Sequence, residues 1–153
     1  MKKKFIILIF IILLVICYEF LRNTGFFLKK DIYKSTRLDV DRCKVINIEF
    51  PEASFNGDGE MFAKFDCDIN TNYFDNLKGW SKFPIIEKIS VRTEKIYELL
   101  KIDKGYYYYI NTEQQKNNIR SDSYEIINSS SSNFILIIYD SNSNALYYYE
   151  YNS

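Results

Sequence analysis

Residues 134–151 read FILIIYDSNSNALYYYEY, and this stretch decides the fold class. Two apolar runs flank a polar turn at residues 140–144, which is the pattern of a β-hairpin. With Tyr139 opposite Ala145, both faces of the hairpin are apolar. One face then carries Phe134, Leu136, Ile138, Leu146 and Tyr148, and the other carries Ile135, Ile137, Tyr147 and Tyr149. Because a strand that is apolar on both faces is covered on both, residues 134–139 are expected in the centre of a sheet.

Alternating apolar residues predict two further strands, at residues 45–50 and 61–65, joined by a loop that contains the turn sequence Asn56-Gly57-Asp58-Gly59. The most apolar face results when Ile46 opposes Phe65, Ile48 opposes Ala63 and Phe50 opposes Met61. More strands are expected at residues 85–92 and 106–110, and a loop at residues 111–133.

Two short helices are expected between these strands. The first follows capping residues at 68–72 and carries Tyr73, Phe74 and Leu77, and the second begins at Thr93 and carries Ile96, Leu99 and Leu100. The whole pattern predicts an α+β fold: an N-terminal transmembrane helix followed by a mainly antiparallel sheet of five or six strands, with two short helices on one face.

The N-terminus predicts a membrane anchor. Three lysines at 2–4 precede an uncharged apolar run from Phe5 to Tyr18, as in a signal peptide or a short transmembrane span. No small residues stand where a peptidase would cut, and Ile16 precedes Cys17 where lipoprotein processing needs a small residue. We therefore expect an uncleaved transmembrane signal-anchor at 1–22, with residues 5–21 in the lipid bilayer, a tether at 23–37 and an extracytoplasmic α+β domain at 38–153.

The lysines at 2–4 favour a cytoplasmic N-terminus, which places a single-pass protein in the cell membrane with the domain outside. Four cations after the span act in the opposite direction: Arg22, Lys29, Lys30 and Lys34. A domain that faces the cytoplasm is the alternative.

Composition excludes several function classes. The chain has 20 Lys plus Arg against 20 Asp plus Glu, so it lacks the positive charge that nucleic-acid binding needs, and no nucleic-acid partner is expected. It has no histidine, which removes the commonest general base and the commonest transition-metal ligand.

Cys43 and Cys67 flank the first predicted hairpin. The register given above opposes Cys43 with Asp68 and puts the two cysteines on opposite faces, which argues against a disulfide, although a β-bulge would bring them together. Cys17 lies in the predicted span and is expected to be inert.

Oxygen side chains alternate along residues 66–72, as they do in calcium loops, but Thr71 replaces the required glycine and Leu77 the required glutamate. No metal, cofactor or catalytic residue is therefore expected. The weak binding candidates are the carboxylates Asp58 and Glu60 and the rings Tyr107 and Tyr109. Solvated loop charges and rings that face the core are the plainer interpretations.

Three segments carry a resemblance: the loop 55–60, Gly105-Tyr106-Tyr107, and the terminal hairpin 133–150. Together they resemble a group of small uncharacterised, N-terminally anchored proteins of low-GC Gram-positive bacteria, which have a Gly-Phe-His-Gly-Asp-Gly loop and a Tyr-rich C-terminal hairpin. Asn56 stands here in place of the group's histidine, and Ser54 in place of its first glycine. The resemblance implies an organism class and a single domain, without a mechanism.

These features favour a non-enzymatic binding or accessory domain at the cell envelope, such as an immunity protein, with another envelope protein or a cell-wall polymer as its partner. The alternative is a carboxylate-dependent cell-wall hydrolase or a carbohydrate-binding domain that uses Asp58, Glu60 and the tyrosines.

Overall fold

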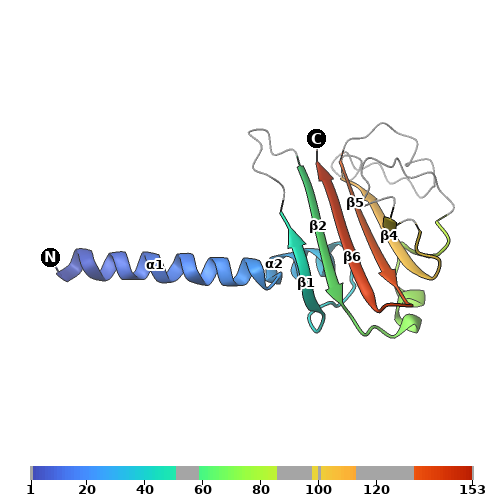
Figure 1. Ribbon diagram of the computed structural model, residues 1–153, viewed down its shortest axis with the longest axis horizontal. Coiled ribbons are helices and arrows are strands. Elements are labelled where there is room, and N and C mark those ends of the chain that lie inside the picture. Colours follow the sequence, from blue (N-terminus) through green and yellow to red (C-terminus); the bar gives the residue numbers. More distant parts are fainter. Residues whose placement is uncertain (1, 51–58, 86–97, 100, 113–132, 153) are drawn as a thin grey trace. The chain divides into compact units, whose positions relative to one another are not determined.

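The computed structural model describes residues 2–50, 59–85, 98–99, 101–112 and 133–152 (Figure 1). The chain divides into two compact units, Met1–Asp41 and Arg42–Ser153, which we call the N-terminal unit and the sheet unit.

The N-terminal unit contains two helices, α1 (Lys2–Asn23) and α2 (Phe26–Thr36). Within α1, the 20 residues Lys4–Asn23 have a mean hydropathy of 2.7, so this helix is long and apolar enough to cross a membrane. Its side chains are not buried against the rest of the chain. Gly25, between the helices, adopts a left-handed φ of 67° that glycine accepts without strain.

Helix α2 occupies most of the stretch that the sequence assigns to a tether. Its buried residues Leu28, Ile32 and Thr36 recur every four positions and therefore share one face. The Thr36 hydroxyl donates to the Ile32 carbonyl at 2.7 Å and accepts the Leu38 N–H at 3.1 Å, which satisfies this buried polar group. The sequence analysis did not predict this helix.

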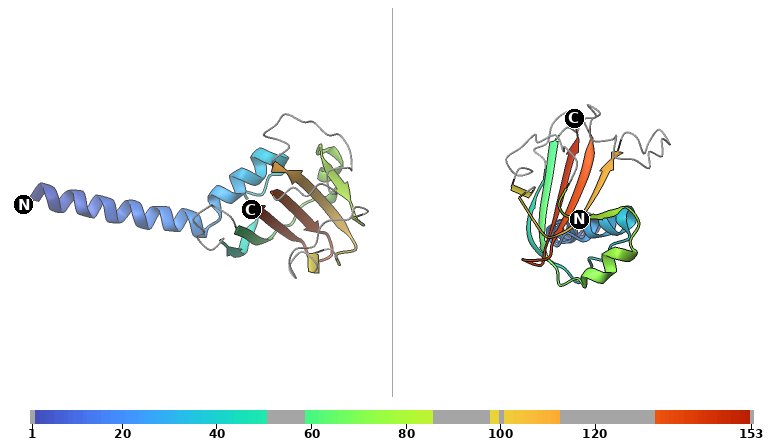
Figure 2. Two further views of the ribbon diagram at one scale, coloured as in Figure 1. Left: turned by 90° about the horizontal axis from the view of Figure 1, so that it is seen from above. Right: turned by 90° about the vertical axis from the view of Figure 1, so that its right-hand side faces the viewer.

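The sheet unit confirms the predicted α+β fold. Six antiparallel strands lie in the order β1-β2-β6-β5-β4-β3. Four of them, β2, β6, β5 and β4, are seen side by side in the right-hand view of Figure 2. Their bounds are β1 Lys44–Glu49, β2 Gly59–Asp66, β3 Trp80–Lys82, β4 Gly105–Asn111, β5 Phe134–Asp140 and β6 Ala145–Asn152. As predicted, β5 is central and buried on both faces.

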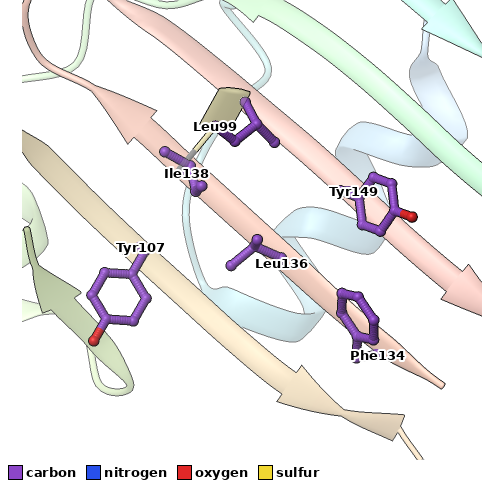
Figure 3. Packing of buried hydrophobic residues seen from close by; sticks show 6 residues of the cluster. All are labelled: Leu99, Tyr107, Phe134, Leu136, Ile138 and Tyr149. Carbon is purple, nitrogen blue, oxygen red and sulfur yellow. The ribbon is translucent and has the colours of Figure 1, made fainter. Parts of the chain in front are cut away.

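The two faces of the sheet have separate cores. The first, which we call the Leu136 face, holds a cluster of buried residues (Figure 3). Its members are Leu99, Tyr107, Phe134, Leu136, Ile138 and Tyr149. The second, the Ile137 face, carries Ala63, Phe65, Ile137, Tyr139, Leu146 and Tyr148, all buried.

The short helices contribute to both cores. The 3-10 helix η1 (Thr71–Asn76) places Phe74 against Tyr139 on the Ile137 face, whereas Leu99 belongs to the cluster on the Leu136 face. The sequence analysis predicted both helices on one face of the sheet. They instead cover opposite faces, because β5 is apolar on both of its faces and each face needs a cover. The predicted helix from Thr93 is described only at Glu98 and Leu99, which are helical, and most of the predicted strand 85–92 lies outside the described residues.

The predicted register of the terminal hairpin is wrong by one residue: Tyr139 pairs with Leu146, and Asp140 with Ala145. The turn explains the difference. The Asp140 carboxylate accepts the Asn142 N–H at 2.9 Å and the Ser143 hydroxyl at 2.6 Å, so Asp140 closes a four-residue turn as the last paired residue. Residues of β6 therefore exchange faces relative to the prediction.

The first hairpin contains a β-bulge, and the bulge corrects the prediction for the cysteines. Ile48 opposes Ala63 as expected, but the register shifts between Val45 and Asn47, so that Val45 rather than Ile46 opposes Phe65. Lys44 then pairs with Asp66, and the next pair outward is Cys43 and Cys67, which form a disulfide with a Cα–Cα distance of 4.5 Å. The prediction against a disulfide is wrong because it assumed an unbroken ladder.

Candidate functional site

Three of the predicted binding residues, Glu60, Tyr107 and Tyr109, lie on one face of the sheet but do not meet. Glu60, in β2, is half-buried and pairs with Tyr151, while Tyr107 and Tyr109 belong to β4, which two strands separate from β2. Asp58 lies outside the described residues.

Both predicted tyrosines pack within the sheet unit. The ring of Tyr107 meets Phe83 edge to face at 5.7 Å, and the ring of Tyr109 stacks on Phe134 at the same distance. Tyr107 is buried and Tyr109 half-buried. In the described structure, therefore, they act as core residues.

Metal binding has no support within the described ranges, where no group of three or more His, Cys, Asp or Glu side chains could hold an ion. The oxygen-rich stretch at 66–72 instead starts a helix. The Asn70 side chain accepts the Asn72 N–H at 3.0 Å, which is an N-cap of η1.

An aromatic cluster fixes η1 to the sheet. Phe74 is buried and stacks on Tyr106 at 4.5 Å and on Tyr139 at 4.9 Å, and the edge of its ring meets Trp80 at 4.8 Å. The Tyr139 hydroxyl lies 3.1 Å from the Ile69 carbonyl, and burial raises the pKa of this hydroxyl. Its protonated form therefore anchors the segment that leads into η1.

An ion pair lies at the rim of this cluster. Lys82 Nζ is 2.9 Å from Asp75 Oδ1, and the Tyr106 hydroxyl donates to the same oxygen at 3.3 Å. The hydrogen bond from Lys82 lowers the pKa of Asp75, and Asp75 in turn raises the pKa of Lys82. Both groups are thus charged at neutral pH and exposed, which suits a polar contact rather than proton transfer. Nothing in the sequence pattern connects these two residues.

The N-terminal unit contains an open pocket of about 780 Å³ next to the C-terminal end of α1. It is lined by Thr24, Phe26, Lys29, Lys30, Tyr33, Asp39 and Asp41. The sequence analysis missed this pocket because it assigned Thr24, Phe26, Lys29, Lys30 and Tyr33 to a tether and Asp39 and Asp41 to the following domain.

Hydrogen bonds and ring contacts shape the pocket. Lys29 Nζ donates to the Asp41 carbonyl at 3.1 Å, and the Asp41 N–H donates to the Asp39 carboxylate at 3.0 Å. Lys30 Nζ lies over the Phe26 ring, 4.3 Å from its centroid. The pocket therefore combines cations, carboxylates and aromatic rings at its wall, and it suits a ligand that has both charged and hydroxyl groups.

Comparisons of the chain with protein-family models, with curated proteins and with solved structures gave no match.

Proposed function

We propose that this chain is a single-pass accessory protein of the cell envelope, whose sheet unit lies outside the cytoplasm and binds another envelope component without catalysing a reaction. The observation that carries the proposal is α1. Its side chains are apolar on every side and exposed along its length, from Phe5 at 64% to Phe20 at 66%. Lipid is the solvent that such a surface prefers.

The disulfide supports the outward orientation. Cys43 and Cys67 are joined within the sheet unit, and structural disulfides form and persist in oxidising compartments outside the cytoplasm. Because the bond follows the span in sequence, an outward sheet unit and a cytoplasmic N-terminus satisfy both the disulfide and the lysines at 2–4.

The packing of the tyrosines favours binding of a partner protein over binding or hydrolysis of a carbohydrate. A sugar-binding platform needs ring faces that are open to solvent. Tyr107 and Tyr109 instead pack against Phe83 and Phe134, and Glu60 is two strands away from them. The Asp75–Lys82 pair is exposed and offers charge complementarity to a partner protein.

Anchoring and orientation can be tested in cells that express the full chain with a C-terminal tag. We expect the tag in the membrane fraction after an alkaline wash, and its loss when intact cells are treated with protease. Full-length chain in the soluble fraction would contradict anchoring. A tag that is protected in intact cells but cleaved after lysis would contradict the orientation.

Partner binding can be tested by crosslinking in intact membranes. A photoreactive residue at Tyr73, which is 40% exposed and precedes Asp75 by two residues in η1, should give a crosslinked species larger than the monomer. The matched control is a photoreactive residue at the buried Phe74. Recovery of the monomer alone from both variants would count against a binding function.

A further inference from the structure

Helix α2 is confined to the membrane surface if α1 spans the bilayer, as the proposed function requires. Only Thr24 and Gly25 separate the two helices, and a chain reaches at most about 3.6 Å per residue. Phe26 therefore lies within roughly 10 Å of the end of the span, in or next to the head-group layer, which is about 5–8 Å deep on each side of the bilayer. The whole helix, at 11 residues, is only about 16 Å long.

The exposed face of α2 carries a stripe of aromatic and basic side chains. With Leu28, Ile32 and Thr36 buried, the opposite face presents Phe26, Lys30, Tyr33, Lys34 and Arg37, all exposed. Aromatic rings and long cations are the side chains that prefer the boundary between lipid and water, because their apolar stems and polar tips are then both satisfied.

Two of these cations lack an opposite charge. Lys30 and Lys34 form no ion pair with the part of the chain that the structure describes, whereas the sheet-unit lysine Lys82 is paired with Asp75. Lys30 also lines the pocket, where its ammonium group lies over Phe26. Lys34 does not line the pocket but follows Lys30 by four residues on α2, so the two side chains are neighbours on the surface of the helix. An anion bound to Lys30 at the mouth of the pocket is therefore one helical turn from Lys34.

We infer that the pocket and the stripe of α2 form a binding site for the phosphodiester of an anionic phospholipid. Lys30 and Lys34 bind the phosphate, the Tyr33 ring contacts the glycerol region, and Asp39 and Asp41 accept hydrogen bonds from hydroxyl groups of the head group. The carboxylates disfavour a ligand that has phosphate alone, so the site fits a phosphatidylglycerol-type head group best. This inference depends on the proposed membrane anchoring.

The test uses the full chain in lipid nanodiscs of two compositions: phosphatidylcholine alone, and phosphatidylcholine with one third phosphatidylglycerol. The measurement is the rate at which a water-soluble amine reagent acylates each lysine, read by peptide mass spectrometry. We expect Lys30 and Lys34 to react about fivefold more slowly in the anionic discs, with Lys82 and Lys104 unchanged.

A second measurement separates a site from a general surface charge. Native mass spectrometry of the chain released from anionic discs should show retained phosphatidylglycerol. The variant Lys30→Gln with Lys34→Gln should lose it, and Lys30→Arg with Lys34→Arg should keep it. The matched control Lys78→Gln with Lys104→Gln, which removes two exposed lysines of the sheet unit, should also keep it.

Three results would overturn the inference. The first is equal acylation rates of Lys30 and Lys34 in the two kinds of disc. The second is equal protection of these lysines when soluble glycerol phosphate replaces the anionic lipid, and the third is protection in native membranes but not in anionic discs. The second would identify a free phosphate ester as the ligand, and the third a partner protein. A chain that never inserts into discs would contradict the proposed anchoring itself, whereas a chain that inserts with unprotected lysines contradicts only the lipid site.

Discussion

Gly105 lies at a position of the sheet unit that has no room for a side chain. It begins β4 with a φ of 150°, and a Cβ built there would collide with the backbone carbonyl of Tyr139. At Gly79 the nearest atom to a built Cβ belongs to the side chain of Tyr108, which can move. The two glycines therefore differ in whether their neighbour can move away.

We expect Gly105→Ala to destabilise the protein by about 2–4 kcal/mol, because the backbone of β5 must shift to relieve the contact. Gly79→Ala should cost less. Urea unfolding of the two variants in detergent, followed by the fluorescence of Trp80, would measure the difference. Equal midpoints would contradict the conclusion that the backbone contact at Gly105 costs more than the side-chain contact at Gly79.

The disulfide gives the second prediction at this scale. It closes a loop with a sequence separation of 24, for which chain entropy predicts about 3–4 kcal/mol of stabilisation. Replacing Cys43 and Cys67 together by serine should lower the free energy of unfolding by that amount. Cys17→Ser is the matched control and should leave it unchanged. In the native chain under denaturing, non-reducing conditions, a maleimide reagent should label Cys17 alone.

The third prediction concerns pH. Lys82 holds the pKa of Asp75 below its ordinary value of 3.8. A carboxyl with a lowered folded-state pKa contributes stability above its unfolded pKa, and this contribution is lost as the pH falls through the folded pKa. In Lys82→Gln, the Asp75 pKa measured by carboxyl NMR should rise toward 3.8. Lys104→Gln should leave it unchanged, and a Lys82→Gln titration identical to the parent's would contradict the ion pair.

Among the elements, α2 contributes to stability through one buried face. Ile32 is 0% exposed and its neighbour Tyr33 is 50% exposed. Ile32→Ala should lower stability by about 2–5 kcal/mol, the usual loss for an emptied apolar site. Tyr33→Ala should change it by about 0.5 kcal/mol or less. Urea midpoints of the full chain in detergent test the pair, and equal losses would show that α2 does not bury the Ile32 face.

The sequence predicted the elements of the sheet unit better than their registers. The strand β5 was identifiable because its six-residue apolar run leaves no polar face, and this conclusion holds for either pairing with β6. The register depended on hydrogen bonds of Asp140 inside the turn, which alternation does not encode. The bulge in β1 likewise leaves no mark in the hydrophobic pattern.

Helix α2 was missed for a different reason. Only Leu28, Ile32 and Thr36 face inward, and one of these is polar, so the helical period is weak among the neighbouring aromatic and charged residues. The pocket depends on this helix and could not be predicted without it. The two tyrosines were correctly expected in a strand, whereas Glu60 was expected in a loop and lies in β2. The separation of Glu60 from the tyrosines by β6 and β5 requires the strand order.

For the whole molecule, the decisive test is the span. Arginine at the centre of a transmembrane helix costs about 2.5–3.5 kcal/mol. Replacing both Ile11 and Leu14 in α1 by arginine should therefore shift much of the chain out of the membrane fraction. Arginines at Ile46 and Tyr73, which are exposed in the sheet unit, should leave the membrane fraction unchanged. Full membrane retention of the α1 variant would contradict a spanning helix.

The two edge strands of the sheet, β1 and β3, are poorly suited to pairing with another sheet. At one end β1 carries Lys44 and the bulge, and at the other β3 is three residues long and includes Lys82. Irregular, charged or short outer strands make poor templates for a neighbour's backbone. If α1 anchors the chain as proposed, copies in one bilayer diffuse in two dimensions and collide often, and an open strand would then invite polymerisation. Edge strands of this kind would disfavour such sheet-to-sheet pairing between crowded copies.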